Sequence, residues 1–386
     1  MCAFQRATTA QMRAAHAVLK QSRWRGVEQL VGKDAIDAAV FGGQLRRAID
    51  LCEDELLQSP RNAELASLVH LLYVELGMPS QAWWSVERRG PMGAALSANL
   101  GMRAFALQMD NWHQRAEESA ARCLAQDPGD CWALLALLEV YGKEGRHRES
   151  LRLLRDLDEH VEASEMHAVF ALRRCHALLE LGKTPALETA LDTATQRIDG
   201  GPWAHWAVAD AARLFWRMRM YNVEGYQAAA RALLEHQVVG APTAFDAVSR
   251  ALLAMACGLQ VSAPERPACG GDVAAIFDSA GLTVVAALGC VANDPVPLIQ
   301  ARGLFAKLGG TCLHRDVLDE TLAFAAMRVP NLNLAMAHEL LARRPSSPRA
   351  WLLHSKVLAW LGYHASADKA EIRARDLGFE QGGNFS

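Results

Sequence analysis

Apolar and polar positions follow a helical period along almost the whole chain, from Thr9 to Leu377. No stretch shows the alternating Val, Ile and Thr pattern of strands. Short clusters interrupt the pattern, and each combines a helix stop with a Ser, Asp or Asn able to cap the next helix. These clusters are Ser59 to Asn62, Gly77 to Ser80, Asp127 to Asp130, Gly200 to Pro202 and Arg344 to Pro348. The pattern predicts an all-α protein of about fifteen to seventeen helices in antiparallel pairs.

Small residues recur at the spacing of a helical hairpin repeat. Gly43 and Gly77 are 34 residues apart, and each is followed five positions later by an alanine, Ala48 or Ala82. Pro60 follows the first pair, and a 34-residue period with a small residue at the helix contact and a later proline is typical of tetratricopeptide repeats. The intervals recur in the pairs Ala116 with Pro128 and Gly362 with Ala367. The spacing predicts an α-solenoid of antiparallel, tetratricopeptide-like hairpins.

One continuous solenoid accounts for all 386 residues, because each repeat packs only on its neighbours. The repeats are clearest at residues 30–160 and 330–377, whereas residues 200–310 keep the helical pattern and lose the repeat spacing. Two prolines and two glycines make residues 261–272 the one long predicted loop, either a lid or a linker. Residues 381–386 are predicted to be a disordered tail.

Composition narrows the classes of partner. The chain is 51% hydrophobic and 22% charged with a formal net charge of -3, which argues against nucleic acid because phosphate binding needs a basic face. The nine cysteines lie mostly one by one in apolar helical stretches, as buried reduced thiols of a cytosolic protein do. The longest apolar run, Leu282 to Ala292, is about half of a bilayer span. We therefore expect a soluble, cytoplasmic protein with neither a membrane nor a nucleic-acid partner.

A metal site is the first chemistry to test, because the chain has thirteen histidines. No two of them stand four residues apart, the spacing that places two ligands on one helical face. His338 and Glu339 begin like a zinc-protease motif, but Ala342 occupies the position of the second histidine. The chain also has no Gly-rich phosphate loop, serine nucleophile elbow or CxxC motif. The sequence predicts no metal and no cofactor.

The densest polar and aromatic cluster falls between residues 203 and 217. Trp206, Asp210, Arg213 and Arg217 share one face of a helix, where an acid and two guanidiniums among aromatic rings could hold an anionic or planar ligand. The simpler interpretation, which we favour, is that Asp210 and Arg213 pair within a helix whose tryptophans fill the core.

Further candidates for catalysis beside Asp210 are His176, His205 and His314. His176 and Glu180 share a helical face, so a carboxylate could orient the imidazole, although an exposed helix pair is the simpler account. His314, Arg315 and Asp316 follow a double glycine at a predicted helix start, where backbone N–H groups and an arginine suit an anion. Equally, Asp316 could serve only to stabilise the helix dipole.

Three segments in succession resemble the tetratricopeptide repeat protein 38-like family, helical-repeat proteins of bacteria and animals. The segments are Asp127 to Ala133 running on to Glu144, Gly145 and Arg146; Asp210 to Arg217; and Gly309 and Gly310 through Arg315, Asp316 and Val317 to Thr321 and Leu322. Their order and intervals are similar as well, so the resemblance covers the chain from about residue 100 onward. It implies a helical-repeat fold more firmly than an activity.

The departures from that family concern its histidines. This chain has Leu135, Glu139, Ser249 and Cys312 at positions where the family tends to have His. The remaining members of the polar set are Asp210, Arg217, Arg315 and Asp316. If those histidines form a functional centre in relatives, this chain has lost it or rebuilt it with groups such as His176, His205 and His314.

The leading functional hypothesis is a solenoid that binds a protein segment or a small molecule in its concave groove without catalysis. The expected ligand contacts are Trp206, Asp210, Arg213, Arg217, Arg315 and Asp316. The alternative is a cofactor-independent enzyme of small-molecule metabolism, for example bacterial secondary metabolism, with its active site at the solenoid centre and the 261–272 loop above it. A homodimer formed through an end hairpin is compatible with either hypothesis.

Overall fold

The computed structural model describes residues 35–36, 39, 45–59, 62–87, 96–198, 203–235, 244–261, 274–291, 293–327, 329 and 332–380. Within these ranges the chain forms nineteen α-helices, one 3-10 helix and no strand, which confirms the all-α prediction. The helix count exceeds the predicted fifteen to seventeen. Two of the helices, α10 and α17, have only five and six residues, too few to show a 3.6-residue period in the sequence.

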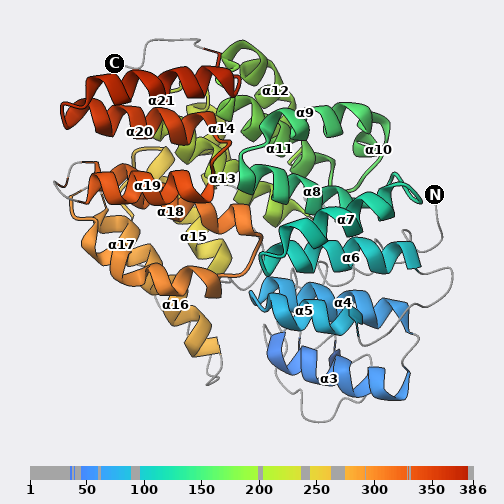
Figure 1. Cartoon of the computed structure of the whole chain (residues 1–386). Helices are drawn as coiled ribbons and strands as arrows, with labels where there is room; N and C mark the ends of the chain where they lie inside the picture. Colours follow the sequence, from blue (N-terminus) through green and yellow to red (C-terminus); the bar gives the residue numbers. More distant parts are fainter. Residues whose placement is uncertain are drawn as a thin grey trace.

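The first part of the stack runs from the N-terminal repeats to the middle of the chain and rises through Figure 1. Its helices are α3 (Leu45–Gln58), α4 (Ala63–Glu75), α5 (Pro79–Glu87), α6 (Leu96–Met109), α7 (His113–Leu124), α8 (Cys131–Glu144), α9 (His147–Asp156), α10 (Asp158–Glu162), α11 (His167–Glu180) and α12 (Thr184–Gln196). Each helix packs on the next, and α6, α9 and α11 also contact the second helix along. This is the contact pattern of stacked helical hairpins.

The second part turns back beside the first and then ends in two further hairpins (Figure 1). Its helices are α13 (Ala204–Met220), α14 (Gln227–Glu235), α15 (Ala244–Ala256), α16 (Ala274–Cys290), α17 (Val296–Ala301), the 3-10 helix Arg302–Lys307, α18 (Cys312–Ala326), α19 (Asn333–Arg343), α20 (Pro348–Trp360) and α21 (His364–Asp376). Helix α18 contacts both α8 and α13, so the returning chain packs against the inner side of the earlier repeats.

Helix burial separates inner from outer helices. On α13 nearly every residue from Trp206 to Met220 is buried, as expected for a helix surrounded by others. On α9 only His147, Ser150 and Leu154 are buried, at the spacing of one helical stripe. The inner helices α8, α11, α13 and α18 therefore meet at the centre, and the outer helices cover them.

Several predicted helix boundaries are confirmed. The Asp130 side chain accepts a hydrogen bond from the Ala133 N–H at 2.7 Å and caps α8, and Ser347 accepts one from Ala350 at 3.2 Å and caps α20. The Gly200 to Pro202 cluster, residues 262–272 of the predicted loop and the predicted tail at 381–386 lie outside the described residues. None of the described helices has both the length and the apolar character needed to cross a bilayer.

The turn after α8 packs on the turn before α20, about two hundred residues later. Gly145 ends α8 with φ of 79°, and a Cβ at this position would lie 2.2 Å from the backbone nitrogen of Ser347. Only a residue without a side chain satisfies both the left-handed backbone and the close approach.

We predict that Gly145→Ala lowers the free energy of unfolding by more than about 3 kcal/mol, because it adds a clash to the backbone strain. The matched control is Gly362→Ala, where φ is 85° and a Cβ would meet nothing within 4 Å. There we expect a loss of only about 1–2 kcal/mol from the left-handed backbone alone. Urea unfolding of both variants measures the difference, and equal losses would contradict the close contact.

Candidate functional site

The carboxylate of Asp210 lies at the centre of the described structure and is only 1% exposed. Its Oδ1 accepts a hydrogen bond from His314 Nε2 at 2.7 Å, and its Oδ2 accepts one from Arg173 Nε at 3.0 Å. These partners come from α18 and α11, so one side chain on α13 joins three helices. Burial alone raises the pKa of Asp210, but Arg173 and His314 hold that pKa well below its usual range.

His314 is fixed in one neutral tautomer. It stands at the third position of α18, where its Nδ1 accepts the Thr311 N–H at 3.1 Å while the Thr311 hydroxyl accepts the His314 N–H at 3.2 Å. Because Nδ1 is an acceptor, the ring proton is on Nε2 and points at Asp210. Burial and the neighbouring Arg213 lower the pKa of His314 well below 6.5. Both ring nitrogens are therefore occupied by structural hydrogen bonds.

A second set of contacts surrounds this pair. Arg173 Nη2 lies 2.7 Å from Glu139 Oε1. Glu139 Oε2 accepts a hydrogen bond from the Leu313 N–H at 2.9 Å, so a carboxylate on α8 caps the N-terminus of α18. Arg213 donates to the carbonyl oxygens of His314 and Ala209 at 2.5 and 2.6 Å. Each buried charge thus meets either an opposite charge or a carbonyl.

Further ion pairs extend the cluster toward the C-terminal hairpins. Arg217 Nε lies 2.6 Å from Glu320 Oε2, and Lys143 Nζ lies 2.7 Å from Asp316 Oδ1. Arg344 also pairs with Asp316. Glu180 accepts a hydrogen bond from Ser347 at 3.1 Å, and Arg349 donates to the Leu179 carbonyl oxygen at 2.7 Å and interacts electrostatically with Glu180. We refer to the whole cluster as the charged centre: Glu139, Lys143, Arg173, Glu180, Asp210, Arg213, Arg217, His314, Asp316, Glu320, Arg344 and Arg349. All but Lys143 are buried, and the Lys143 side chain is 17% exposed.

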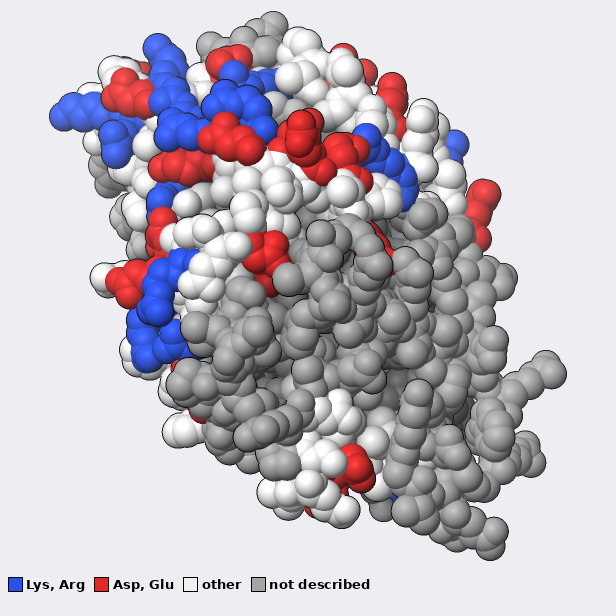
Figure 2. Space-filling view, turned by 90° about the vertical axis from the view of Figure 1, so that its right-hand side faces the viewer, with Lys and Arg blue, Asp and Glu red and all other residues white. Residues whose placement is uncertain are grey.

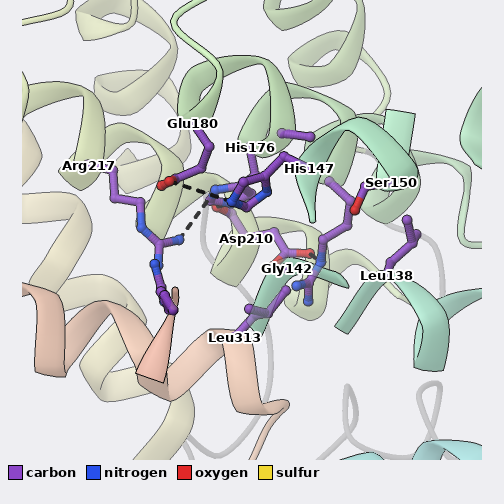
Figure 3. A pocket seen from close by; sticks show the side chains of 12 residues that line it. Leu138, Gly142, His147, Ser150, His176, Glu180, Asp210, Arg217 and Leu313 are labelled. Carbon is purple, nitrogen blue, oxygen red and sulfur yellow. Dashed lines mark hydrogen bonds and ion pairs between the residues drawn. The ribbon is translucent and has the colours of Figure 1, made fainter. Parts of the chain in front are cut away.

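His176 also has both ring nitrogens engaged. Its Nε2 donates to the backbone oxygen of Asp210 at 3.0 Å, and its Nδ1 lies 3.4 Å from Arg217 Nη1 (Figure 3). Burial and the positive charge of Arg217 lower the pKa of His176 to about 3. Like His314, this histidine is neutral at pH 7.

A small cavity opens beside the charged centre (Figure 3). Its volume is about 30 Å³, room for about two water molecules and far below the size of a metabolite pocket. The walls come from α8, α9, α11, α13, the start of α18 and the turn after α19, and the lining residues are Leu138, Gly142, His147, Ser150, Arg173, His176, Ala177, Glu180, Asp210, Arg217, Leu313 and Arg344.

An aromatic cluster connects the charged centre to the first repeats. The Trp206 ring lies 5.9 Å from His314 and 5.2 Å from Trp203, measured between ring centroids. Its Nε1 donates at 2.8 Å to Glu75 on α4, and the same carboxylate oxygen lies 3.1 Å from His205 Nε2. Burial lowers the pKa of His205, but the charge of Glu75 and its hydrogen bond together raise that pKa above its usual value. The predicted packing of tryptophans in the core is confirmed here.

The structure brings three of the four predicted catalytic candidates together. Asp210 and His314 belong to the charged centre and His176 contacts the backbone oxygen of Asp210, whereas His205 lies beside Glu75. The favoured pairing of Asp210 with Arg213 is wrong, because Asp210 pairs with Arg173 on another helix. The expected exposed pair of His176 and Glu180 is also wrong, since Glu180 is 4% exposed and both residues line the cavity.

The predicted ligand contacts lie inside the helix stack. Trp206, Asp210, Arg213 and Arg217 are at most 5% exposed, Asp316 is 2% exposed, and Arg315 donates to the carbonyl oxygens of Gly309 and Gly310. In the structure each of these groups contacts other groups of the protein interior, and their part in ligand binding stays a prediction.

Sequence reasoning missed Lys143, Glu320, Arg344 and Arg349 as members of the charged centre. The available signal was a charged residue inside an otherwise apolar helical stripe, as at Glu139 within the run Leu134 to Val140. Glu139 and Ser249, two positions where the resemblance led us to expect histidine, contact Arg173 and Arg213 respectively. Within the described ranges, no group of three or more histidine, cysteine or acidic side chains is gathered as metal ligands are.

The contacts between successive helices define the chain as an all-α helical-repeat protein. No family profile matches its sequence, and no curated protein matches it. Among solved structures, the human IFIT1 dimer with m7Gppp-AAAA is similar at 12% identity over 97% of this chain and 95% of that chain, with a TM-score of 0.38. The structure of Naa15/Naa10 bound to HypK-THB is similar at 12% identity over 97% of this chain and 64% of that chain, with a TM-score of 0.24.

TM-scores below 0.5 carry no information about a shared ligand or partner. The resemblance to the tetratricopeptide repeat protein 38-like family stays a prediction as well.

We predict that Asp210→Asn lowers the free energy of unfolding by about 3–5 kcal/mol, because it leaves the buried Arg173 with less opposing charge. The control is Asp158→Asn, which removes an ion pair with Arg174 whose side chains are 54% and 37% exposed. For this control we expect the free energy of unfolding to fall by less than about 0.5 kcal/mol. Equal effects in urea unfolding would show that the charged centre is not the stabilising element.

The neutral state of His176 predicts a pH dependence. Its pKa is about 3 in the folded chain and about 6.5 when unfolded, so the unfolded state binds the proton first and wild-type stability falls as the pH drops below 6.5. A glutamine at this position takes up no proton in the unfolded state, so the variant does not lose stability in this way. The destabilisation caused by His176→Gln should therefore shrink by about 3 kcal/mol between pH 7 and pH 4. A difference that stays constant over this range would contradict the neutral imidazole.

Proposed function

We propose that this protein is a non-catalytic helical-repeat scaffold that binds a protein partner. The observation that supports this is an exposed aromatic surface on α5 and at the start of α7, the tryptophan patch, formed by Trp83, Trp84, Trp112 and Arg115. Trp84 is 54% exposed and Trp112 is 51% exposed. Large apolar side chains that are exposed together mark interaction surfaces.

The members of the tryptophan patch support one another. The Trp83 and Trp84 rings lie 5.0 Å apart, and the Arg115 guanidinium lies 5.9 Å from the Trp83 ring and 5.5 Å from the Trp112 ring. Trp112 Nε1 also donates at 3.2 Å to Asp110, which accepts a bond from Ser80 at 3.1 Å. A patch held in place before binding loses less entropy on binding, and Trp and Arg are the residues most enriched among binding hot spots.

A protein partner suits this surface better than a nucleic acid. Tryptophan rings can stack on bases, and one of the matched structures holds an m7Gppp-AAAA ligand, but a nucleic-acid site also needs a basic groove for the phosphates. Asp110 contacts the patch, and Glu118 follows Arg115 by one helical turn. In the part of the face that Figure 2 colours, basic and acidic side chains are interspersed without a field of one sign.

The concave groove predicted from the sequence stays a prediction. In the described part of the chain, however, the inner faces of α8, α11, α13 and α18 contact one another through the charged centre. This is why we assign binding to the outer patch. The cytoplasmic location, the absence of a nucleic-acid partner and a homodimer belong to the same proposal.

The enzyme alternative has less support. It requires a free acid or base next to a space for substrate, whereas both ring nitrogens of His314 and His176 are hydrogen-bonded and the adjoining cavity measures about 30 Å³. Links to bacterial secondary metabolism rest on the sequence hypothesis alone.

The test compares the wild-type protein with the double variant Trp84→Ser, Trp112→Ser. The partner is first identified as a protein retained by the wild type from cell extract, then purified, and its dissociation constant is measured for each variant. We expect the double variant to bind at least about 30-fold more weakly, because hot-spot tryptophans contribute about 2 kcal/mol or more. The control is Trp360→Ser, which removes a tryptophan that is 61% exposed on α20 and should bind normally.

Equal binding by the double variant and the wild type would contradict the proposal. So would a stoichiometric small molecule that co-purifies with the wild type, because it would favour the enzyme alternative. If the retained protein is a second copy of this chain, the native mass will show a dimer that the double variant loses, and the patch is then the dimer interface.

A further inference from the structure

The first repeats meet the middle of the chain at the C-terminal end of α4. Glu75 is the last residue of that helix, and its Oε1 lies 2.8 Å from Trp206 Nε1 and 3.1 Å from His205 Nε2, both on α13. The backbone approaches closely at the same place, because a Cβ on Gly309, in the turn before α18, would lie 2.2 Å from the Glu75 carbonyl oxygen. Glu75 is therefore held beside His205 by packing that does not depend on the charge of the ring.

The His205 ring is buried between two acids. The side chains of His205 and Glu75 are only 11% and 9% exposed. The second acid is Asp246 in the first turn of α15. Burial lowers the pKa of His205, but Glu75 and Asp246 together raise that pKa above its ordinary value of 6.5. The proton of this ring thus depends on groups from three different helices.

The other charges around α13 lie away from this ring. Arg173 of α11 and His314 of α18 bind Asp210, more than one helical turn beyond His205. Among the described residues, both charged groups that act on His205 are acids. The dipole of α13 disfavours a cation at its N-terminus, whereas the dipole of α4 favours one at Glu75. The two carboxylates therefore decide the charge of the ring.

We propose that the contact between Glu75 and His205 is a pH-dependent latch on the first repeats. While His205 carries a proton, its ion pair with Glu75 holds α4, and the helices α3 and α5 packed on it, against α13. When that proton is lost at higher pH, the neutral ring can still donate through Nε2, so the contact weakens without breaking. The first repeats then open more often, while the charged centre stays packed. This inference does not depend on the partner of the tryptophan patch.

The direction of the effect follows from proton linkage. A histidine whose pKa is raised by folding stabilises the folded state fully below the pKa of the unfolded chain, about 6.5, and this stabilisation is lost as the pH rises through the folded-state value. The matched control is His113, which also faces a glutamate, Glu144, at 3.6 Å. Burial lowers the pKa of His113, so its contribution to stability grows with pH instead.

The first test measures the pKa of both histidines in the full chain by NMR titration, with signals assigned from His205→Gln and His113→Gln. We expect His205 to titrate above 6.5 and His113 below 6.5. Glu75→Gln should lower the pKa of His205, because the ring then loses its nearest carboxylate. A pKa of His205 at or below 6.5 in the wild type would overturn the proposal.

The second test follows the latch in the wild-type protein by native-state hydrogen exchange at pH 6 and pH 8.5, corrected for the intrinsic effect of pH on exchange. We expect the opening equilibrium constant of α4 to rise by about threefold or more over this range relative to that of α20 and α21. His205→Gln should remove this rise, whereas His113→Gln should keep it. Equal responses of α4 and the C-terminal hairpin would overturn the proposal, as would a rise at α4 that persists in His205→Gln.

Discussion

One buried carboxylate determines how the chain closes on itself. Asp210 on α13 binds Arg173 on α11 and His314 on α18, and the second of these contacts spans 104 residues of sequence. An ionised group in the interior is tolerated only where opposite charges and hydrogen bonds compensate for its lost hydration. The position of α18 against the earlier repeats therefore depends on this contact and on the ion pairs around it.

The elements that the sequence predicts well are those set by local interactions. Asp130 caps α8 through a contact three residues away, and the spacing of the buried residues on α9 reflects its own helical period. The shared face of Trp206, Asp210, Arg213 and Arg217 follows from the period in the same way. Each of these features can be predicted without knowing which helix lies opposite.

The pairings across the interior could not be predicted in this way. Lys143 and Asp316 are 173 residues apart, and Arg217 and Glu320 are 103 apart, so no periodicity relates them. The local partner Arg213 was therefore preferred for Asp210, and Glu180 was expected on an exposed face. The exposure of individual tryptophans could not be predicted from the sequence either. Trp206 is fully buried while Trp84 is 54% exposed, although both stand in amphipathic helical segments. Tertiary packing decides which face of such a segment is covered.

The central claim is that the charged centre joins α8, α11, α13 and α18 into one cooperative unit. Native-state amide hydrogen exchange tests it most directly, because it gives an opening free energy for each helix separately. Our account predicts that the core amides of these four helices share one opening free energy, the highest in the chain, and that Asp210→Asn lowers it for all four together. Exchange of α18 at a clearly lower free energy than α13, with no common response to that substitution, would contradict it.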